Sequence, residues 1–119
     1  MQSDSEVQSN LPLTEATFLM LLSLRSGPTH GYAILKDVQA LSGDRVHLST
    51  GTLYGGIQRM LDRGWIRRAP EVDSVEEGRE RIAYALTDLG LRILEAEIDR
   101  LRSLLRVANQ VARGENSAA

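Results

Sequence analysis

The sequence predicts a mainly helical chain with one small β-hairpin. Three observations support this fold class. Apolar residues recur at helical spacing over 50–62, two segments with strand-forming residues follow at 65–69 and 81–86, and a long amphipathic segment occupies 87–112. A chain of 119 residues has the size of one domain.

Composition excludes several classes of protein. The chain has no cysteine, so it has neither a disulfide framework nor thiolate chemistry. Its longest apolar run, Phe18 to Leu22, is too short to span a membrane. Asp4 and Glu6 stand where a signal peptide would be basic. We therefore expect a cytoplasmic protein without membrane contact.

The first helix is expected to run from Thr14 to about Arg25. Its apolar residues cover more than one face, so the helix must be buried on two sides. In so small a domain, a second copy of the chain is expected to supply part of that cover through Phe18 and Leu22.

A second helix is expected from His30 to about Leu41, after a turn at residues 26–28. Thr29 stands at the position of its N-terminal cap. Tyr32 is expected to lie in the core. The segment 42–44 ends this helix.

The third helix, over residues 50–62, is the most informative element. Its buried face is a stripe of apolar residues: Leu53, Ile57, Met60 and Leu61. Ser49 or Thr50 is expected to cap it, and Gly64 ends it. Its outward residues are short and polar, which suits a helix lying in the major groove of DNA.

Two adjacent glycines, Gly55 and Gly56, lie inside this third helix. Each destabilises a helix by about 1 kcal/mol relative to alanine. Close approach of the helix backbone to DNA would explain them, and so would close packing against another helix. The sequence leaves both explanations open.

The segments 65–69 and 81–86 are expected to pair as a hairpin, anchored to the helices by Trp65. The acidic segment 71–77 between them is expected to be a mobile loop. Two helices with a polar second helix, followed by a hairpin, form a winged helix-turn-helix. The wing carries four arginines: Arg67, Arg68, Arg79 and Arg81. Because alternate strand residues face opposite ways, about two of the four are expected on DNA, and the alternative is ion pairing with nearby glutamates.

The last helix, residues 87–112, carries apolar residues at alternating spacings of three and four, which is a heptad pattern that pairs helices. We expect it to form a homodimer. The alternative is a helix that covers its own domain. The candidate dimerisation residues are Phe18, Leu22, Leu91, Leu94, Ile98, Leu101 and Leu105. The chain thus divides into a disordered tail at 1–10, a winged helix-turn-helix at 11–86, the dimerisation helix at 87–112 and a second disordered tail at 113–119.

Local charge supports a DNA-binding surface, although the net charge is −2. Between Asp44 and Arg68, five arginines stand against two aspartates, a balance of +3. Helix N-termini can hold phosphates, and Gln58 and Arg59 can pair with adenine and guanine. The candidate DNA-binding residues are Thr29, His30, Ser49, Thr50, Thr52, Tyr54, Gln58, Arg59, Arg67, Arg68 and Arg81. For the hydroxyl residues at helix starts, the competing role is capping, and for Tyr54 it is a half-buried place in the core.

Four short motifs also resemble one family. They are Thr-His-Gly-Tyr-Ala-Ile at 29–34, Gly-Thr-Leu-Tyr at 51–54, Gly-Trp-Ile at 64–66 and Tyr-Ala-Leu-Thr-Asp-Leu-Gly at 84–90. With these four motifs in this order, the chain resembles the PadR-like transcriptional regulators over residues 11–112. The resemblance implies a homodimeric repressor at a palindromic operator, with the last helix packed on the partner's first helix. It also implies that a small-molecule effector could release the DNA, although the sequence assigns no residues to one.

Other chemistry finds little support in the sequence. No nucleophile motif or phosphate-binding glycine loop is present, so we expect no enzyme and no cofactor. The two histidines, His30 and His47, lack a second ligand at helical spacing, so we expect no metal site. The alternative function is a winged-helix module that binds another protein.

Overall fold

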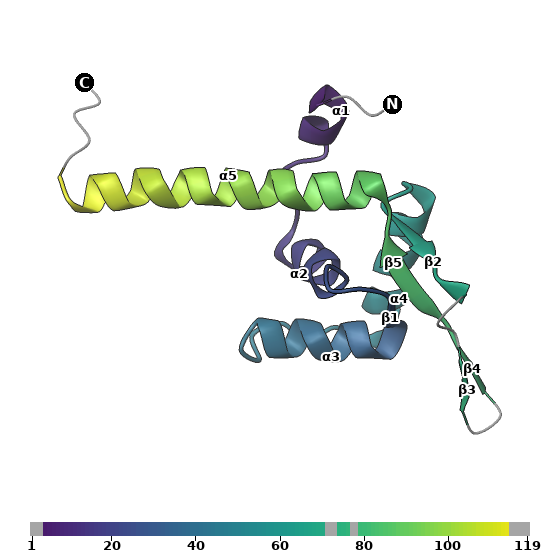
Figure 1. The fold of residues 1–119 in the computed structure, drawn as a ribbon. Coiled ribbons are helices and arrows are strands. Elements are labelled where there is room, and N and C mark those ends of the chain that lie inside the picture. The colour runs from purple at the N-terminus through teal and green to yellow at the C-terminus, as the bar shows by residue number, and fades with distance from the viewer. Residues whose placement is uncertain (1–3, 71–73, 77–78, 115–119) are drawn as a thin grey trace.

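The computed structural model describes residues 4–70, 74–76 and 79–114. Five helices and five strands lie in these ranges (Figure 1). The helices are α1 (Asp4–Ser9), α2 (Glu15–Ser23), α3 (Gly31–Leu41), α4 (Thr50–Asp62) and α5 (Asp88–Ala112). The strands are β1 (Thr29–His30), β2 (Ile66–Arg68), β3 (Ser74–Glu76), β4 (Arg79–Arg81) and β5 (Ala83–Leu86).

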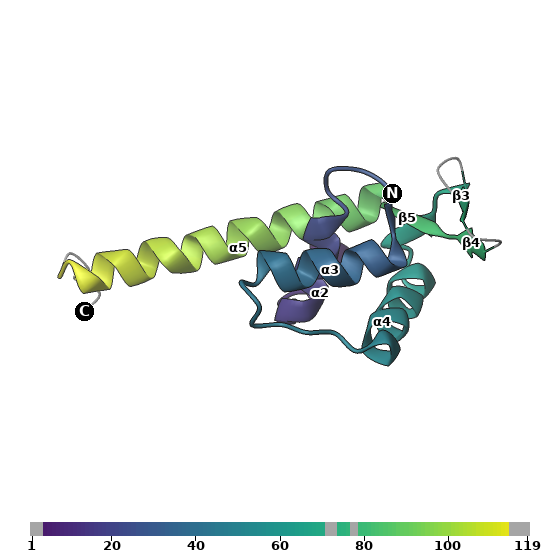
Figure 2. The same ribbon diagram turned by 90° about the horizontal axis from the view of Figure 1, so that it is seen from below.

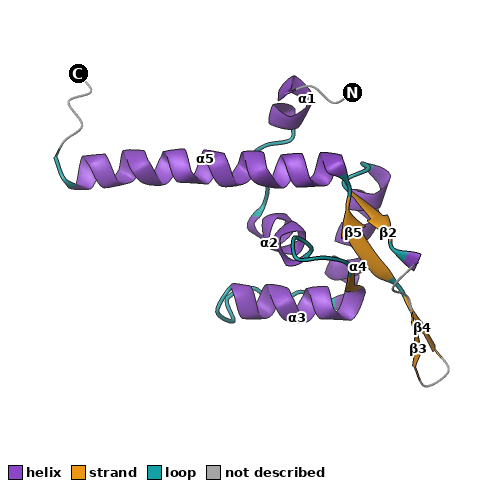
Figure 3. Ribbon diagram, in the orientation of Figure 1, coloured by secondary structure: helices purple, strands orange, loops and turns teal. Residues whose placement is uncertain are grey.

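Helices α2, α3 and α4 pack together beside a small antiparallel sheet with strand order β1-β5-β2 (Figure 3). The far half of α5 extends away from this body, and the molecule measures 64 × 37 × 22 Å (Figure 2). This arrangement confirms the predicted fold class, a mainly helical winged helix-turn-helix with a small hairpin and a long last helix.

The predicted third helix is α4, with the predicted cap. The Ser49 Oγ atom accepts a hydrogen bond from the Thr52 backbone N–H at 3.0 Å. Leu53, Ile57 and Met60 are buried on its inner face. The chain leaves the helix at Gly64, whose φ of +75° is a conformation that favours glycine.

The predicted start of the second helix is wrong by one residue, since α3 begins at Gly31 and not at His30. Thr29 and His30 form strand β1, which pairs with β5 through Thr29↔Tyr84 and His30↔Ala83. His30 therefore takes the cap position of α3, without a side-chain cap bond. The Thr29 hydroxyl instead donates to the Gly27 carbonyl at 3.0 Å.

The predicted core position of Tyr32 is also wrong, since this residue is 54% exposed. The buried face of α3 is set by Ile34 and Val38, which are both fully buried. Tyr32 lies two residues before Ile34, about 200° around the helix, so its ring points away from that face.

The predicted pairing of segments 65–69 and 81–86 is present as β2 with β5, and a further hairpin, β3–β4, lies between these two strands in the chain. β2 pairs with β5 from Ile66↔Leu86 to Arg68↔Tyr84, while β3 pairs separately with β4. The predicted second strand is thus divided at Ile82, because β5 lies between β1 and β2 whereas β4 pairs with β3 alone. Part of the expected mobile loop forms β3, and its remaining residues, 71–73 and 77, lie outside the described residues.

Trp65 anchors the sheet to the helices, as predicted, with 3% of its surface exposed. The start of α5 is bonded to the same segment, the link between α4 and β2. The Thr87 backbone N–H donates to the Trp65 carbonyl at 3.0 Å, and the Thr87 hydroxyl donates to the Gly64 carbonyl at 2.6 Å. The Thr87 Oγ1 atom also caps α5 by accepting from the Gly90 N–H.

The N-terminal segment that we expected to be disordered contains helix α1. Its Val7 is 4% exposed because α1 packs on α5, on the side of α5 opposite α2 (Figure 1). One apolar residue in a polar segment gave too weak a pattern to predict this contact. At the other end of the chain, α5 ends at Ala112, and residues 115–119 lie outside the described residues.

The predicted dimerisation residues of α5 fall into two groups that differ in burial. Leu94 is fully buried in the core of its own domain, and Leu91 and Ile98 are half-buried. Leu94 therefore cannot contact a partner in this conformation, whereas a dimerisation role for Leu91 and Ile98 stays a prediction. Beyond it, Leu101 is 39% exposed and Leu105 is 61% exposed. Phe18 and Leu22 of α2 are half-buried against the protein's own core.

Candidate nucleic-acid interface

The outer face of α4 is the centre of the candidate site. Thr50, Thr52, Gln58 and Arg59 are all exposed on it, while the opposite face of the helix is buried. The β3–β4 hairpin projects from the body beyond the sheet (Figure 1, Figure 2). A polar helix face near an extended hairpin is the arrangement of winged-helix proteins that read the major groove.

At the start of α4, the hydroxyl groups mainly serve the helix. The Ser49 hydroxyl donates to the Thr52 Oγ1 atom at 2.9 Å, in addition to accepting from the Thr52 backbone. Capping is thus the first role of Ser49, as predicted. Ser49 and Thr52 are nevertheless exposed, and Thr50 is exposed as well.

The two predicted base readers differ in their surroundings. The Gln58 side-chain amide donates to the Asp62 Oδ1 atom at 2.9 Å, one turn further along α4. Arg59 makes no ion pair within the described part of the chain, and its guanidinium group lies beside Gly55 and Gly56. Arg59 therefore has donors for two hydrogen bonds, whereas one amide N–H of Gln58 is already bonded to Asp62.

Tyr54 is 50% exposed, in agreement with its predicted place at the edge of the apolar stripe. Its ring lies against Gly31 at the start of α3. A Cβ atom on Gly31 would come within 3.0 Å of the Tyr54 hydroxyl oxygen and 3.1 Å of its ring. Tyr54 thus joins the two helices and still presents surface to solvent.

His30 is poorly placed for the phosphate contact that the sequence suggested. Its Nε2 atom is buried and has no hydrogen-bond partner within the described part of the chain. Neighbouring Thr29 is half-buried and already donates to Gly27. These two residues join α3 to the sheet, and their side chains are turned toward the protein.

In the wing, Arg67 and Arg68 are both exposed on β2, which is an edge strand of the sheet. The Arg67 Nη1 atom donates to the Arg68 carbonyl at 3.1 Å. The backbone of Arg81 pairs with Ser74, and the side chains of Arg79 and Arg81 lie outside what the structure describes.

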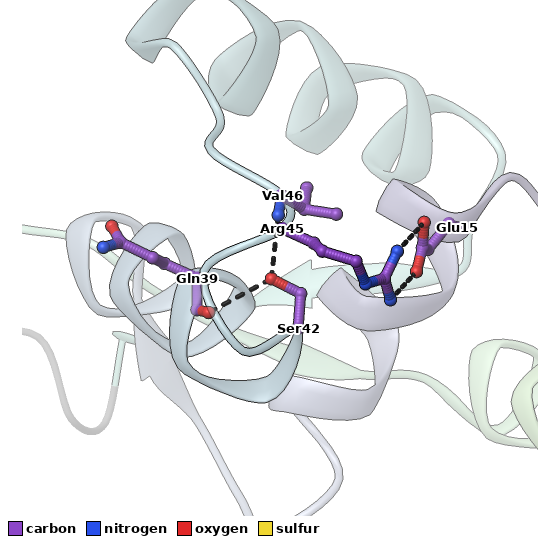
Figure 4. Close-up of polar contacts among 5 residues, drawn as sticks. All are labelled: Glu15, Gln39, Ser42, Arg45 and Val46. Atoms are coloured by element: carbon purple, nitrogen blue, oxygen red, sulfur yellow. Dashed lines mark hydrogen bonds and ion pairs between the residues drawn. The ribbon is translucent and has the colours of Figure 1, made fainter.

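Arg45 is one of the five arginines in the local charge balance of +3, and it forms an ion pair with Glu15 at the start of α2 (Figure 4). The Arg45 Nη1 atom donates to Glu15 Oε1 at 3.1 Å, and Nη2 donates to Oε2. The bond from Arg45 holds the pKa of the Glu15 carboxyl below its ordinary value. This pair fixes the loop before α4.

Ser42 supports the same loop (Figure 4). Its hydroxyl donates to the Gln39 carbonyl at 3.1 Å and accepts from the Val46 N–H at 2.9 Å. The Gln39 side chain in turn donates to Asp44, a residue with a φ of +67°. Sequence reasoning missed this loop structure, because the Arg45–Glu15 contact joins residues thirty positions apart.

Among the described residues, no group of three or more histidines or acidic side chains is arranged to hold a metal ion. None of the helices in the described ranges combines the length and the apolar character that crossing a bilayer requires.

Comparison with known proteins decides the family. The model of the transcriptional regulator PadR-like family matches residues 19–96, which run from α2 into α5. The chain belongs to the PadR-like family. This membership agrees with the prediction of a regulator and not an enzyme.

Solved structures of similar chains support the PadR-like fold. A PadR family transcription regulator from Clostridium difficile has 27% sequence identity and a TM-score of 0.67, covering 83% of this chain and 99% of that chain. Bacillus subtilis PadR in complex with operator DNA has 23% identity and a TM-score of 0.62, covering 73% of this chain and 48% of that one.

A curated relative is an uncharacterised 37.1 kDa protein in a transposon, Tn4556, of Streptomyces fradiae. It is 35% identical to this PadR-like chain over 97 residues, or 82% of this chain. The match spans about a quarter of the length of that relative.

Proposed function

We propose that this PadR-like chain is a sequence-specific DNA-binding regulator that represses transcription in the cytoplasm as a homodimer. The observation that carries the proposal is the exposed outer face of α4, where Gln58 and Arg59 project from a helix whose other face is buried. The relative from Bacillus subtilis, solved with operator DNA, supports the same use of this fold.

In this proposal α4 enters the major groove, and the wing contacts the flanking backbone. Arg59 pairs with guanine, and Gln58 pairs with adenine. Arg67, Arg68 and Arg81 of the wing hold phosphates, with Ser49, Thr50, Thr52 and Tyr54 beside the start of α4. Thr29 and His30 contribute through the position of α3 instead of through their side chains.

The homodimer is supported by the far half of α5. A row of large apolar residues is exposed there: Leu101, Leu104, Leu105, Val107 and Val111. A helix that leaves such a row in water is typical of a dimer interface. Two copies related by a twofold axis present two α4 helices, so the operator is a palindrome with half-sites in successive major grooves.

Binding to the operator represses transcription by covering the promoter. A small-molecule effector that changes the pairing of the two α5 helices would alter the distance between the two α4 helices and release the DNA. We assign no residues to such an effector.

The test is selection of bound fragments from a random pool of duplex DNA by the purified full chain, followed by fluorescence anisotropy with the selected and scrambled duplexes. We expect one palindromic sequence and an affinity that falls steeply between low and physiological salt. Failure to enrich any sequence would favour the alternative function, a winged-helix module that binds a protein through the outer face of α4.

A further inference from the structure

The two adjacent glycines of α4 have different surroundings. Gly56 is buried on the inner face, where a Cβ atom would lie 3.2 Å from the Met20 Cε atom and 3.3 Å from its sulfur. These distances are shorter than ordinary van der Waals contacts. Close packing against Met20 of α2 therefore favours glycine at residue 56.

The same explanation fails for Gly55. A Cβ atom there would meet one atom within 4 Å, the Arg59 Nη1 atom, at an ordinary contact distance of 3.6 Å. Its φ is also not in the left-handed region that favours glycine. Alanine is a stronger helix former than glycine, so a side chain at this position would stabilise the isolated protein.

Gly55 lies beside Arg59, the candidate base reader that has no competing partner among the residues that the structure describes. Arg59 is four residues later on the same face of α4, and its guanidinium group runs back along the helix, with Nη1 nearest Gly55 and Nη2 3.7 Å from the Cβ position of Gly56. At Gly55 the outer face of α4 thus carries no side chain, and the guanidinium group of Arg59 lies beside this half-buried backbone.

We propose that Gly55 is a specificity-determining position, the point where the backbone of α4 meets the edges of the base pairs in the major groove. The missing side chain sets the depth of α4 in the groove, and that depth decides which base pair the Arg59 guanidinium reaches. This inference rests on the proposed function. It adds a positioning residue, Gly55, that acts through the absence of a side chain.

The test uses Gly55→Ala and Gly55→Leu in the full chain, with thermal unfolding and anisotropy on the selected operator and on a scrambled duplex. Both variants should unfold at or above the wild-type temperature, because both residues favour helix. Operator affinity should fall at least about tenfold for alanine and further for leucine, while affinity for the scrambled duplex changes less. Gly56→Ala is the matched control, and it should unfold at a lower temperature because Met20 must move.

Two results would overturn this inference. If both Gly55 variants bound the operator within about twofold of the wild type, no DNA would approach the backbone at this position. If both unfolded well below the wild type, the glycine would serve the fold instead. Failure of the proposed function is distinguishable, because the wild-type chain itself would then select no sequence.

Discussion

Gly90 of α5 and Trp65 lie so close together that a Cβ atom on Gly90 would stand 1.9 Å from the Trp65 carbonyl oxygen. The obstructing atom belongs to the backbone, so no side-chain rotation can make room. Only glycine allows α5 to begin against the corner between α4 and β2, where Thr87 also bonds to Gly64 and Trp65.

Gly90→Ala is therefore expected to destabilise the protein by at least about 2 kcal/mol, at the upper end of overpacking substitutions. Urea unfolding followed by far-UV circular dichroism measures the change. Gly55→Ala is the matched control, because it adds the same methyl group to a helix where there is space. Equal midpoints for Gly90→Ala and the wild type would contradict the geometry of this corner.

The exposed apolar row on α5 gives a second prediction. Leu101→Asp combined with Leu105→Asp should convert dimers into folded monomers, because two charges would enter a dehydrated interface while the protomer core is untouched. Analytical ultracentrifugation gives the mass, and circular dichroism reports the fold. Arg106→Asp changes the charge at a position at least 100° around the helix from every residue of this row and should remain dimeric. An intact dimer of the double variant would rule out this row as the interface.

Glu97 gives a prediction about pH. Its side chain is 2% exposed, accepts bonds from Arg100 at 2.6 and 3.0 Å and also accepts the Leu13 N–H at 3.1 Å. The bonds from Arg100, aided by Leu13, hold the pKa of the Glu97 carboxyl below its ordinary value of 4.5 against the effect of burial. A carboxyl whose pKa is lowered by folding stabilises the protein above its unfolded pKa, and that stability is lost as the pH falls through the folded value.

Glu97→Gln should therefore lower the free energy of unfolding at pH 7 by about 1–3 kcal/mol, the usual range for bonds to a charged group. The difference from the wild type should shrink as the pH falls below 4.5. Urea titrations at a series of pH values measure both effects. If the two proteins kept a constant difference down to pH 3, the ionised form of Glu97 would not be the stabilising one.

Local patterns predicted the parts of this structure that depend on neighbours in sequence. The stripe of α4 and its Ser49 cap follow from residues three or four positions apart, so the sequence contains the whole signal. Glu97 and Leu13 are 84 residues apart, and no local pattern indicates their contact. The heptad spacing of α5 identified an apolar stripe, but Leu94 shows that a stripe can equally cover its own domain.

The candidate site follows the same rule. The exposure of Gln58 and Arg59 was predictable from helix periodicity. The bond from Gln58 to Asp62 fits the same periodicity, yet the sequence does not say whether the two side chains meet. His30 was predicted at a helix start with a possible phosphate contact, whereas it lies in β1, paired with the distant β5, with its Nε2 atom buried.

The last prediction separates base reading from backbone contact. Arg59→Ala should weaken operator binding by about 1–3 kcal/mol and relax the base preference at one position of each half-site. Arg68→Ala should weaken binding to all duplexes alike and reduce the slope of log affinity against log salt by about one per lost phosphate contact. The reason is position, since Arg59 projects from the outer face of α4 and Arg68 from the edge strand of the wing. Anisotropy titrations on operator and scrambled duplexes at several salt concentrations distinguish the two effects. If the wing variant lost specificity while the helix variant lost only general affinity, the wing and not α4 would read the sequence.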